Sequence, residues 1–330
     1  MARYNISLIR GDGIGPEQTA AAKKILETIS DKSSTKFTIN EVDAGDSALA
    51  KHGKALPDSS VDTIKKSHAC LKGPVGESAA DVIIVLRRMF DLYANVRPAK
   101  SYPNIPSLSD KVDLVTVREN TEDVYLGWEF NADENTVVAL RITSERASRR
   151  IAEYAFKTAM IRDNKRRVVA VHKANVLRKG DGLFATTCKS VAKKYPRIQY
   201  SELYVDACSM NLIRNPYGDI LSDEAAQVVG GLGMGPAANI GDQFALFEPV
   251  HGAAFDIAGK NAANPSSILL SAKMMLEWLA DKYNDKSLVV EARRIEDAIS
   301  SALKKSSKTK DIGGTLSTTE FTELLAKNMY

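Results

Sequence analysis

Short apolar runs alternate along the chain with longer segments in which apolar positions recur every three or four residues. Residues 4–9 form a short run of β-prone side chains, and the glycines that follow at residues 11–15 cannot continue a strand. Pro16 then opens an alanine-rich segment that reaches residue 29, which is typical of a helix because proline fits a first helical turn. Alternation of this kind predicts an α/β fold with a largely parallel sheet.

The same pattern predicts most of the remaining elements. Strands are expected at residues 36–42, 69–71, 112–117, 137–142, 167–171 and 200–205. Helices are expected at residues 59–66, 79–93, 144–160, 182–194, 266–283, 289–304 and 318–329. Prolines at positions 98, 103 and 106 and the glycine-rich stretch at 230–235 interrupt the pattern, and they predict two crossings between lobes.

Composition and charge are those of an ordinary globular protein. Of the 330 residues 44% are hydrophobic and 26% are charged, and 45 basic against 41 acidic side chains give a formal net charge of +4. Because the basic residues are spread along the chain, neither nucleic acid nor a membrane is expected as a partner. The three cysteines lack the spacing of a metal or redox motif. We expect no signal peptide and no membrane span, and therefore a cytoplasmic protein.

The glycine loop at residues 11–15 is the first candidate for binding chemistry. Its pattern is G-x-G-x-G followed by proline, whereas the dinucleotide fingerprint is G-x-G-x-x-G with an acidic residue after the second strand. Taken alone, the loop predicts a tight strand-to-helix turn rather than a pyrophosphate site.

Arginines at the ends of predicted elements form a second candidate site. Arg97 and Arg118 close apolar strand segments, and Arg87 and Arg88 follow an apolar helical turn. Guanidinium groups bind carboxylates through two parallel hydrogen bonds, so this set is typical of a di- or tricarboxylate site. Surface ion pairs are the alternative, and for Arg88 that is the interpretation we favour.

A pair of aspartates and a polar loop complete the candidates. Asp219 and Asp223 stand four positions apart in a predicted helix, so their carboxylates share one face and would repel each other without a cation such as Mg2+ or Mn2+ between them. Acidic residues also stabilise a first helical turn, so the pair alone leaves both interpretations open. The loop at 248–260, which contains His251 and Asp256, suits a nucleotide, although a single loop histidine is more often structural.

Together and in order, these segments resemble the β-decarboxylating dehydrogenases, the family of isocitrate and 3-isopropylmalate dehydrogenases. The resemblance implies a two-lobed α/β fold that is not a Rossmann fold, with a large mixed sheet flanked by helices. One lobe would comprise residues 1–95 and 231–330, and a dimerisation lobe residues 96–230. The matching segments are GDGIGPE at 11–17, LKGP at 71–74, LR at 86–87, DLYANVRP at 91–98, RENTEDVY at 118–125, HKAN at 172–175, YVD at 204–206, GDILSDE at 218–224, EPVHGAAFDIAGK at 248–260 and DIGG at 311–314.

The resemblance also implies a reaction and residue roles. Tyr125 and Lys173 would be the catalytic acid–base pair, with Lys173 supplied by the neighbouring subunit of a homodimer or of a tetramer built from dimers. Asp256 beside the adenosine ribose would favour NAD over NADP, because a carboxylate accepts a hydrogen bond from a free 2′-hydroxyl and repels a 2′-phosphate. Substrate would be bound by Arg87, Arg97, Arg118, Ile83 and Ile84, the cofactor by His251, Gly252, Ala253, Asp256, Ile257 and Asn264, and Mg2+ or Mn2+ by Asp219, Asp223 and the neighbour's Asp206.

The helical turn before Arg87 indicates which substituted malate is the substrate. Members of the family that act on isocitrate place Ser and Asn at the positions of Asp81 and Ile83. An isopropyl group would pack favourably against Ile83 and Ile84, by about 0.8 kcal/mol per methylene, whereas an unpaired carboxylate would cost several times that. Apolar residues in such a run usually face the core, but the match to the family's specificity positions outweighs this interpretation. We therefore expect 3-isopropylmalate, as in leucine biosynthesis, with isocitrate or homoisocitrate as alternatives.

The chain departs from the family at one point. Pro216 runs straight into Tyr217, where the family has roughly ten further residues, about one strand and its turn. Either neighbouring segments compensate, or the chain is a non-catalytic or deletion-impaired subunit. The retained Tyr125, Lys173 and three metal aspartates favour the enzyme.

Overall fold

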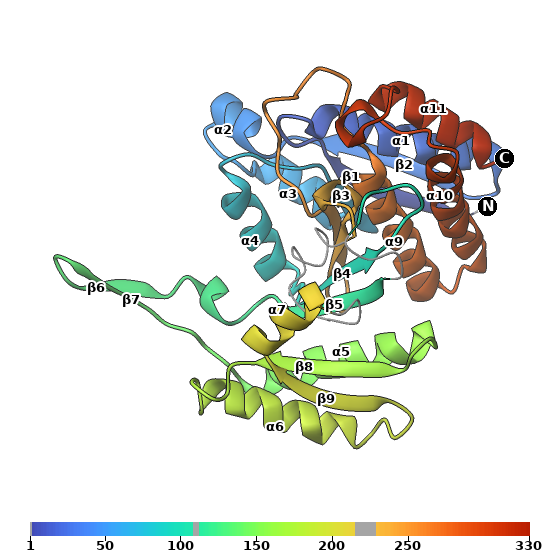
Figure 1. Cartoon of the computed structure of the whole chain (residues 1–330). Coiled ribbons are helices and arrows are strands. Elements are labelled where there is room, and N and C mark those ends of the chain that lie inside the picture. The colour runs from blue at the N-terminus through green and yellow to red at the C-terminus, as the bar shows by residue number, and fades with distance from the viewer. Residues whose placement is uncertain (1, 108–111, 215–228) are drawn as a thin grey trace.

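A seven-stranded mixed sheet forms the centre of the protein, of which a computed structural model describes residues 2–107, 112–214 and 229–330. The strand order is β2-β1-β3-β11-β10-β4-β5 (Figure 1). The first four of these strands are parallel, and each later neighbour in the order is antiparallel to the one before it. Their bounds are β1 Arg3–Ile9, β2 Lys36–Val42, β3 Ala69–Lys72, β4 Ala94–Lys100, β5 Asp113–Glu119, β10 Pro236–Ile240 and β11 Ala245–Pro249.

Helices cover both faces of this sheet, which confirms the expected α/β class. Because successive strand residues point to opposite faces, neighbours such as Leu246 and Phe247 enter different apolar clusters. The larger cluster joins the sheet to α1 (Gly15–Lys32), α9 (Ser266–Tyr283), α10 (Lys286–Lys304) and α11 (Thr318–Asn328). The smaller cluster joins it to α3 (Asp58–Lys65) and α4 (Ala79–Met89), and α2 (Asp46–His52) precedes them.

A second, smaller unit has its own core. β8 (Arg167–His172) and β9 (Gln199–Tyr204) form a parallel pair. They pack on α5 (Glu145–Arg162) and α6 (Gly180–Ala192) around a cluster that includes Phe156 and Val191. α7 (Val205–Arg214) follows β9, and the antiparallel hairpin of β6 (Glu129–Asp133) and β7 (Thr136–Ala139) projects away from the body (Figure 1).

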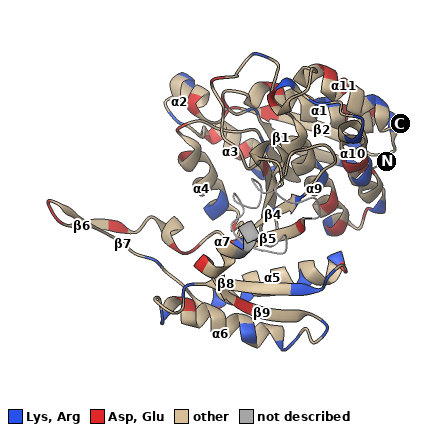
Figure 2. Ribbon diagram, in the orientation of Figure 1, with Lys and Arg blue, Asp and Glu red and all other residues tan. Residues whose placement is uncertain are grey.

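Acidic and basic residues are interspersed over both units rather than gathered on one of them (Figure 2). Within the described ranges, no helix combines the length and the hydropathy that a membrane span requires. The boundaries between the two predicted lobes remain a prediction, because the central sheet continues through position 95 into β4 and β5.

Two predictions about the segment around residue 95 are wrong. The helix expected to reach residue 93 ends at Met89, and Asp91 has a positive φ of 46° that breaks the helical path. The prolines do not interrupt a strand at position 98, because Pro98 lies within β4. β10 pairs with β4 only as far as Val96, so the N–H that proline lacks is not needed on that side.

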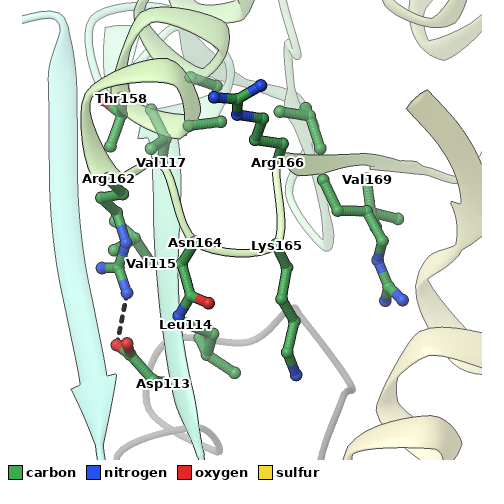
Figure 3. A pocket seen from close by; sticks show the side chains of 14 residues that line it. Asp113, Leu114, Val115, Val117, Thr158, Arg162, Asn164, Lys165, Arg166 and Val169 are labelled. Atoms are coloured by element: carbon green, nitrogen blue, oxygen red, sulfur yellow. Dashed lines mark hydrogen bonds and ion pairs between the residues drawn. The ribbon is translucent and has the colours of Figure 1, made fainter. Parts of the chain in front are cut away.

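A cavity of about 170 Å³ opens between the central sheet and the smaller unit, where β5 and β8 face each other (Figure 3). Its apolar lining includes Val115 and Val117 of β5 and Val169 of β8, and α5 contacts both strands. Within the described residues β5 pairs only with β4, and β8 only with β9. The family segment missing after Pro216 has about the length of one strand, and we expect such a strand to lie between β5 and β8.

We expect that inserting the about ten missing residues from a close relative between Pro216 and Tyr217 raises the melting temperature. An apolar strand placed in the cavity would pair with both facing edges and bury the valines between them. A gain of about 1 kcal/mol shifts the melting temperature of a domain this large by roughly 2–4 °C. The control is a Gly/Ser insertion of equal length, which lacks apolar side chains; an equal melting temperature for both insertions would contradict the prediction. Thermal unfolding followed by circular dichroism is the measurement.

Candidate active site

One face of the central sheet, the face covered by α4, carries a row of polar side chains. The register places Asn239 of β10 opposite Asn95 of β4, and Asn95 opposite Arg118 of β5. Directly opposed residues point to the same face, so these three side chains lie side by side. Arg97 follows Asn95 by two positions and joins that face. The sequence predicted the two arginines, and strand pairing brings them together.

A buried carboxylate at the end of β11 lies between two cations. Glu248 is 2.9 Å from the Nζ of Lys72 and 3.5 Å from the Nη2 of Arg87, and all three side chains are at most 13% exposed. Burial by itself would raise the pKa of Glu248, but Lys72 and Arg87 outweigh burial and hold that pKa at about 2. The carboxylate is thus ionised, and these three groups together carry one net positive charge.

Two asparagines hold the arginines of this site. The Nε of Arg87 donates to the Oδ1 of Asn239 at 3.0 Å, and the Nε of Arg97 donates to the Oδ1 of Asn95 at 2.7 Å. Sequence reasoning missed both asparagines. The signal for Asn239 was a single polar residue inside the otherwise apolar PAANI segment of β10, whereas the segment of Asn95 also contains Arg97 and Lys100.

Tyr125 lies beside the third arginine. It belongs to the short 3-10 helix η1 (Val124–Leu126), and the Arg118 guanidinium is 4.9 Å from the centre of its ring, which is a cation–π contact. The Nη2 of Arg88 donates to the backbone oxygen of Tyr125 at 2.6 Å. The interpretation of Arg88 as a surface ion pair is therefore wrong, because its guanidinium holds the turn that carries Tyr125.

Lys173 and Asp206 form a separate pair in the smaller unit. Lys173 follows β8, Asp206 lies in the first turn of α7, and the Lys173 Nζ donates to the carboxylate at 2.9 Å. This hydrogen bond lowers the pKa of Asp206 and keeps it anionic. Asp219 and Asp223 lie outside the described residues. Within the described ranges, no three His, Cys, Asp or Glu side chains come together as a metal site.

The glycine loop forms a tight turn, as its spacing predicts. Gly13 has a φ of 56°, and a Cβ there would lie 2.0 Å from the carbonyl oxygen of Ala253. The neighbouring Ile14 donates its N–H to the same oxygen at 2.8 Å. The carboxylate of Asp12 accepts hydrogen bonds from the N–H groups of Asp46 and Ser47. Protein atoms therefore fill the space that a phosphate would need in a dinucleotide loop.

The predicted cofactor residues lie next to this turn. The Nδ1 of His251 lies 3.0 Å from the Gly252 oxygen, and its Nε2 is buried with no hydrogen-bond partner among the described residues. Burial lowers the pKa of His251, which favours the neutral ring. Asp256 is exposed and Ile257 half-buried. Asn264 accepts two hydrogen bonds from Ser266 through its Oδ1, so its side chain also supports the start of α9.

The two isoleucines predicted to determine specificity differ in their surroundings. Ile83 is half-buried and packs against the smaller apolar cluster of the sheet. Ile84 is half-buried one turn before Arg87. Asp81 and Val85 line a second cavity beside α2 and α3, so Asp81 does not face the arginine site.

Comparisons with known proteins agree with the resemblance. Residues 5–325 match the family model described as isocitrate/isopropylmalate dehydrogenase. The 3-isopropylmalate dehydrogenase of Sulfurisphaera tokodaii is 49% identical over 96% of each chain, and that of Saccharolobus solfataricus is 46% identical over 99% of each. The crystal structure of isocitrate dehydrogenase from Methylococcus capsulatus superposes with a TM-score of 0.88, at 37% identity and 99% coverage of both chains. The Saccharolobus alignment spans 338 positions against 330 residues here, so that relative has residues that this chain lacks.

Stability should depend on the charge of Glu248. Its folded-state pKa is depressed to about 2 from an ordinary 4.5, so its stabilising contribution is complete above pH 4.5 and is lost as the pH falls from there through about 2. Glu248→Gln should lower the free energy of unfolding at pH 7 by about 3–5 kcal/mol, because Lys72 and Arg87 lose their counter-charge. This difference should shrink in urea titrations as the pH falls from about 4.5 toward 2.

A surface carboxylate provides the control for this series. Glu145 forms an exposed pair with Arg149 one turn along α5, and Glu145→Gln should cost less than about 1 kcal/mol. A wild-type to Glu248→Gln difference that is the same at every pH would show that the carboxylate charge is not the source of the stability.

Proposed function

This chain belongs to the isocitrate/isopropylmalate dehydrogenase family, and from that premise we propose that it performs the NAD-dependent oxidative decarboxylation of 3-isopropylmalate in leucine biosynthesis, in the cytoplasm. As a family member it is an oxidative decarboxylating dehydrogenase. The observation that carries the substrate proposal is the row of Arg87, Arg97 and Arg118 around one face of the sheet, beside Tyr125. A malate core offers two carboxylates to such a row.

The chain's own residues have distinct proposed roles in the reaction. The arginines bind the carboxylates and thereby hold the C2–C3 bond of the substrate in one orientation. Lys173 accepts the C2 hydroxyl proton, and Tyr125 donates a proton to C3 after CO2 has left. When bound, NAD would supply the hydride acceptor for C2, and a divalent cation would supply positive charge for the C2 oxygen.

The loop after β11 fits the adenosine half of NAD. The buried Nε2 of His251 has no partner among the described residues, so a hydrogen-bonding group of the cofactor could satisfy it. We place the remaining contacts on Gly252, Ala253, Ile257 and Asn264. The exposed carboxylate of Asp256 favours a ribose with a free 2′-hydroxyl, and thus NAD.

The proposed cation site rests on carboxylate chemistry. Asp206 is exposed and anionic, and carboxylate oxygens are the ligands that Mg2+ and Mn2+ prefer. Asp219 and Asp223, outside the described residues, are the other two ligands that we propose.

A homodimer is the assembly that we propose, in which Lys173 and Asp206 complete the partner's site. Two observations support it. Within the described residues, the contacts of Tyr125 are with Arg88 and Arg118, whereas Lys173 pairs with Asp206. The β6–β7 hairpin and the residue before it also expose large apolar side chains, which are typical of an interface. These are Trp128, Phe130 and Val137, each more than half exposed.

The function is tested by following NADH production in the presence of Mn2+ with 3-isopropylmalate, isocitrate and homoisocitrate. The highest kcat/KM is expected for 3-isopropylmalate, and NAD should outperform NADP. Ile84→Asn should lower kcat/KM for 3-isopropylmalate by about ten-fold or more, because an apolar subsite loses its contact with the isopropyl group. Ile83→Ser should act in the same direction and also lower the melting temperature, since Ile83 packs in the core.

Val85 provides the matched control. Val85→Asn changes the next residue of α4, but Val85 lines the cavity beside α2 and α3, so kcat/KM should stay within about two-fold of wild type. A higher kcat/KM for isocitrate than for 3-isopropylmalate would refute the substrate assignment. No turnover with any of the three would favour a non-catalytic or deletion-impaired subunit.

The shared site is tested by mixing inactive variants. Tyr125→Phe and Lys173→Met should each be nearly inactive alone. Random dimers formed by refolding the mixture should regain about a quarter of wild-type activity, because half of them are hybrids with one intact site of two. If no activity returns although hybrids are detected by mass spectrometry, both residues act within one chain and the shared site is wrong.

A further inference from the structure

We propose that Asn239 is a positioning residue that aligns the two carboxylate-binding arginines, Arg87 and Arg97. This inference rests on the proposed function, which assigns those arginines to the substrate. Asn239 itself need not touch the substrate, because it acts through the guanidinium groups.

The side chain of Asn239 is fully buried and is hydrogen-bonded on both sides of its amide. Its Oδ1 accepts three hydrogen bonds, from the Nε of Arg87 at 3.0 Å, from the Nδ2 of Asn95 at 2.8 Å and from the Nδ2 of Asn120 at 3.0 Å. Its Nδ2 donates to the Oε1 of Glu248 at 2.8 Å. One amide of β10 thus connects α4, β4, β11 and the residue that follows β5.

The connection to Arg97 runs through Asn95. Because the Nδ2 of Asn95 is fixed by Asn239, its Oδ1 faces the other way and accepts from the Nε of Arg97 at 2.7 Å. The two asparagines are opposed in the register of β10 and β4, so the sheet itself fixes the spacing between them. One side chain thus contacts Arg87 directly and Arg97 through Asn95.

A neutral amide suits this place for an electrostatic reason. An amide oxygen orients a guanidinium without cancelling its charge, whereas a second carboxylate beside Glu248 would neutralise the charge that must bind the substrate. The amide NH2 also fixes the rotamer of Glu248, so that this one carboxylate serves both Lys72 and Arg87. The cluster keeps an excess of positive charge for an anionic ligand, and its geometry is set in advance.

The proposal predicts a change in substrate binding rather than in the chemical step. Asn239→Ala removes the acceptor shared by Arg87 and Asn95. Since a hydrogen bond to a charged group is worth about 1.5–3 kcal/mol, KM for 3-isopropylmalate should rise by about ten- to a hundred-fold. The kcat should fall by less than about three-fold and KM for NAD should stay unchanged, because in the described part of the chain Asn239 contacts neither Tyr125 nor Lys173 and the arginines remain in place to bind the substrate.

Asn239→Asp gives a second readout that a purely structural role would not produce. The shape and the acceptor oxygen remain, but a new titratable carboxylate faces Glu248 of β11, Lys72 of β3, Arg87 of α4 and Arg97 of β4, with Arg118 of β5 farther along the row. Two adjacent carboxylates share one proton at low pH. As the pH rises they lose this proton, and the additional negative charge then opposes binding of the substrate carboxylates. KM for 3-isopropylmalate should therefore rise with pH in this variant more steeply than in the wild type.

The control is Asn104→Ala. Asn104 donates to the backbone oxygens of Leu303 and Lys304, far from the polar row, so this variant should keep wild-type KM values. Circular dichroism and melting temperature establish which variants are folded. If Asn239→Ala does not fold, the isosteric Asn239→Asp variant carries the test through its pH profile.

The outcomes separate this inference from the proposed function. If the wild type turns over 3-isopropylmalate but KM is unchanged in Asn239→Ala and its pH profile is unchanged in Asn239→Asp, the positioning role is wrong. If the wild type turns over none of the three acids, the proposed function fails, and the binding of malate is then measured by thermal shift. Malate that stabilises the wild type and Asn104→Ala but not the Asn239 variants supports the positioning role, whereas equal stabilisation of all of them overturns it.

Discussion

The buried carboxylate of Glu248 imposes the strongest constraint on this structure, because an ionised group out of contact with water must have its counter-charges in fixed positions. Lys72 and Arg87 provide them from β3 and α4, and the amide of Asn239 holds the carboxylate in place. These contacts connect β3, β10, β11 and α4 on one face of the sheet. The polar row of the candidate active site extends from these contacts toward β4 and β5.

The pairing register of the strands places the polar and charged side chains of the candidate site next to one another. The antiparallel pairing of β10, β4 and β5 brings residues more than a hundred positions apart into adjacent places on one face. Arg97 and Arg118 enter the site from neighbouring strands, and Arg87 comes from the helix above them. These charged groups project from strands and a helix, and buried amides accept hydrogen bonds from Arg87 and Arg97.

Lys173 and Asp206, for which we propose an acid–base role and a metal-binding role, lie on the smaller unit. Lys173 and Asp206 follow β8 and β9, and the edges of β5 and β8 face each other across a cavity without a strand between them in the described ranges. The polar row lies on strands of the central sheet that the structure describes.

The sequence by itself determined the α/β class, most helices and strands, and the identity of the charged residues, because these depend on local periodicity and on which side chains are present. It also identified the glycine loop as a turn from its spacing. The strands β10 and β11 escaped prediction because segments of five residues carry little local signal, and the helix before Tyr93 was predicted too long because the positive φ of Asp91 ends it. Only the tertiary structure decided that Asn95, Asn239 and Glu248 support the arginines, and that Arg88 holds the turn of Tyr125. These contacts join residues distant in sequence, and pairing register and burial, rather than any local pattern, decide them.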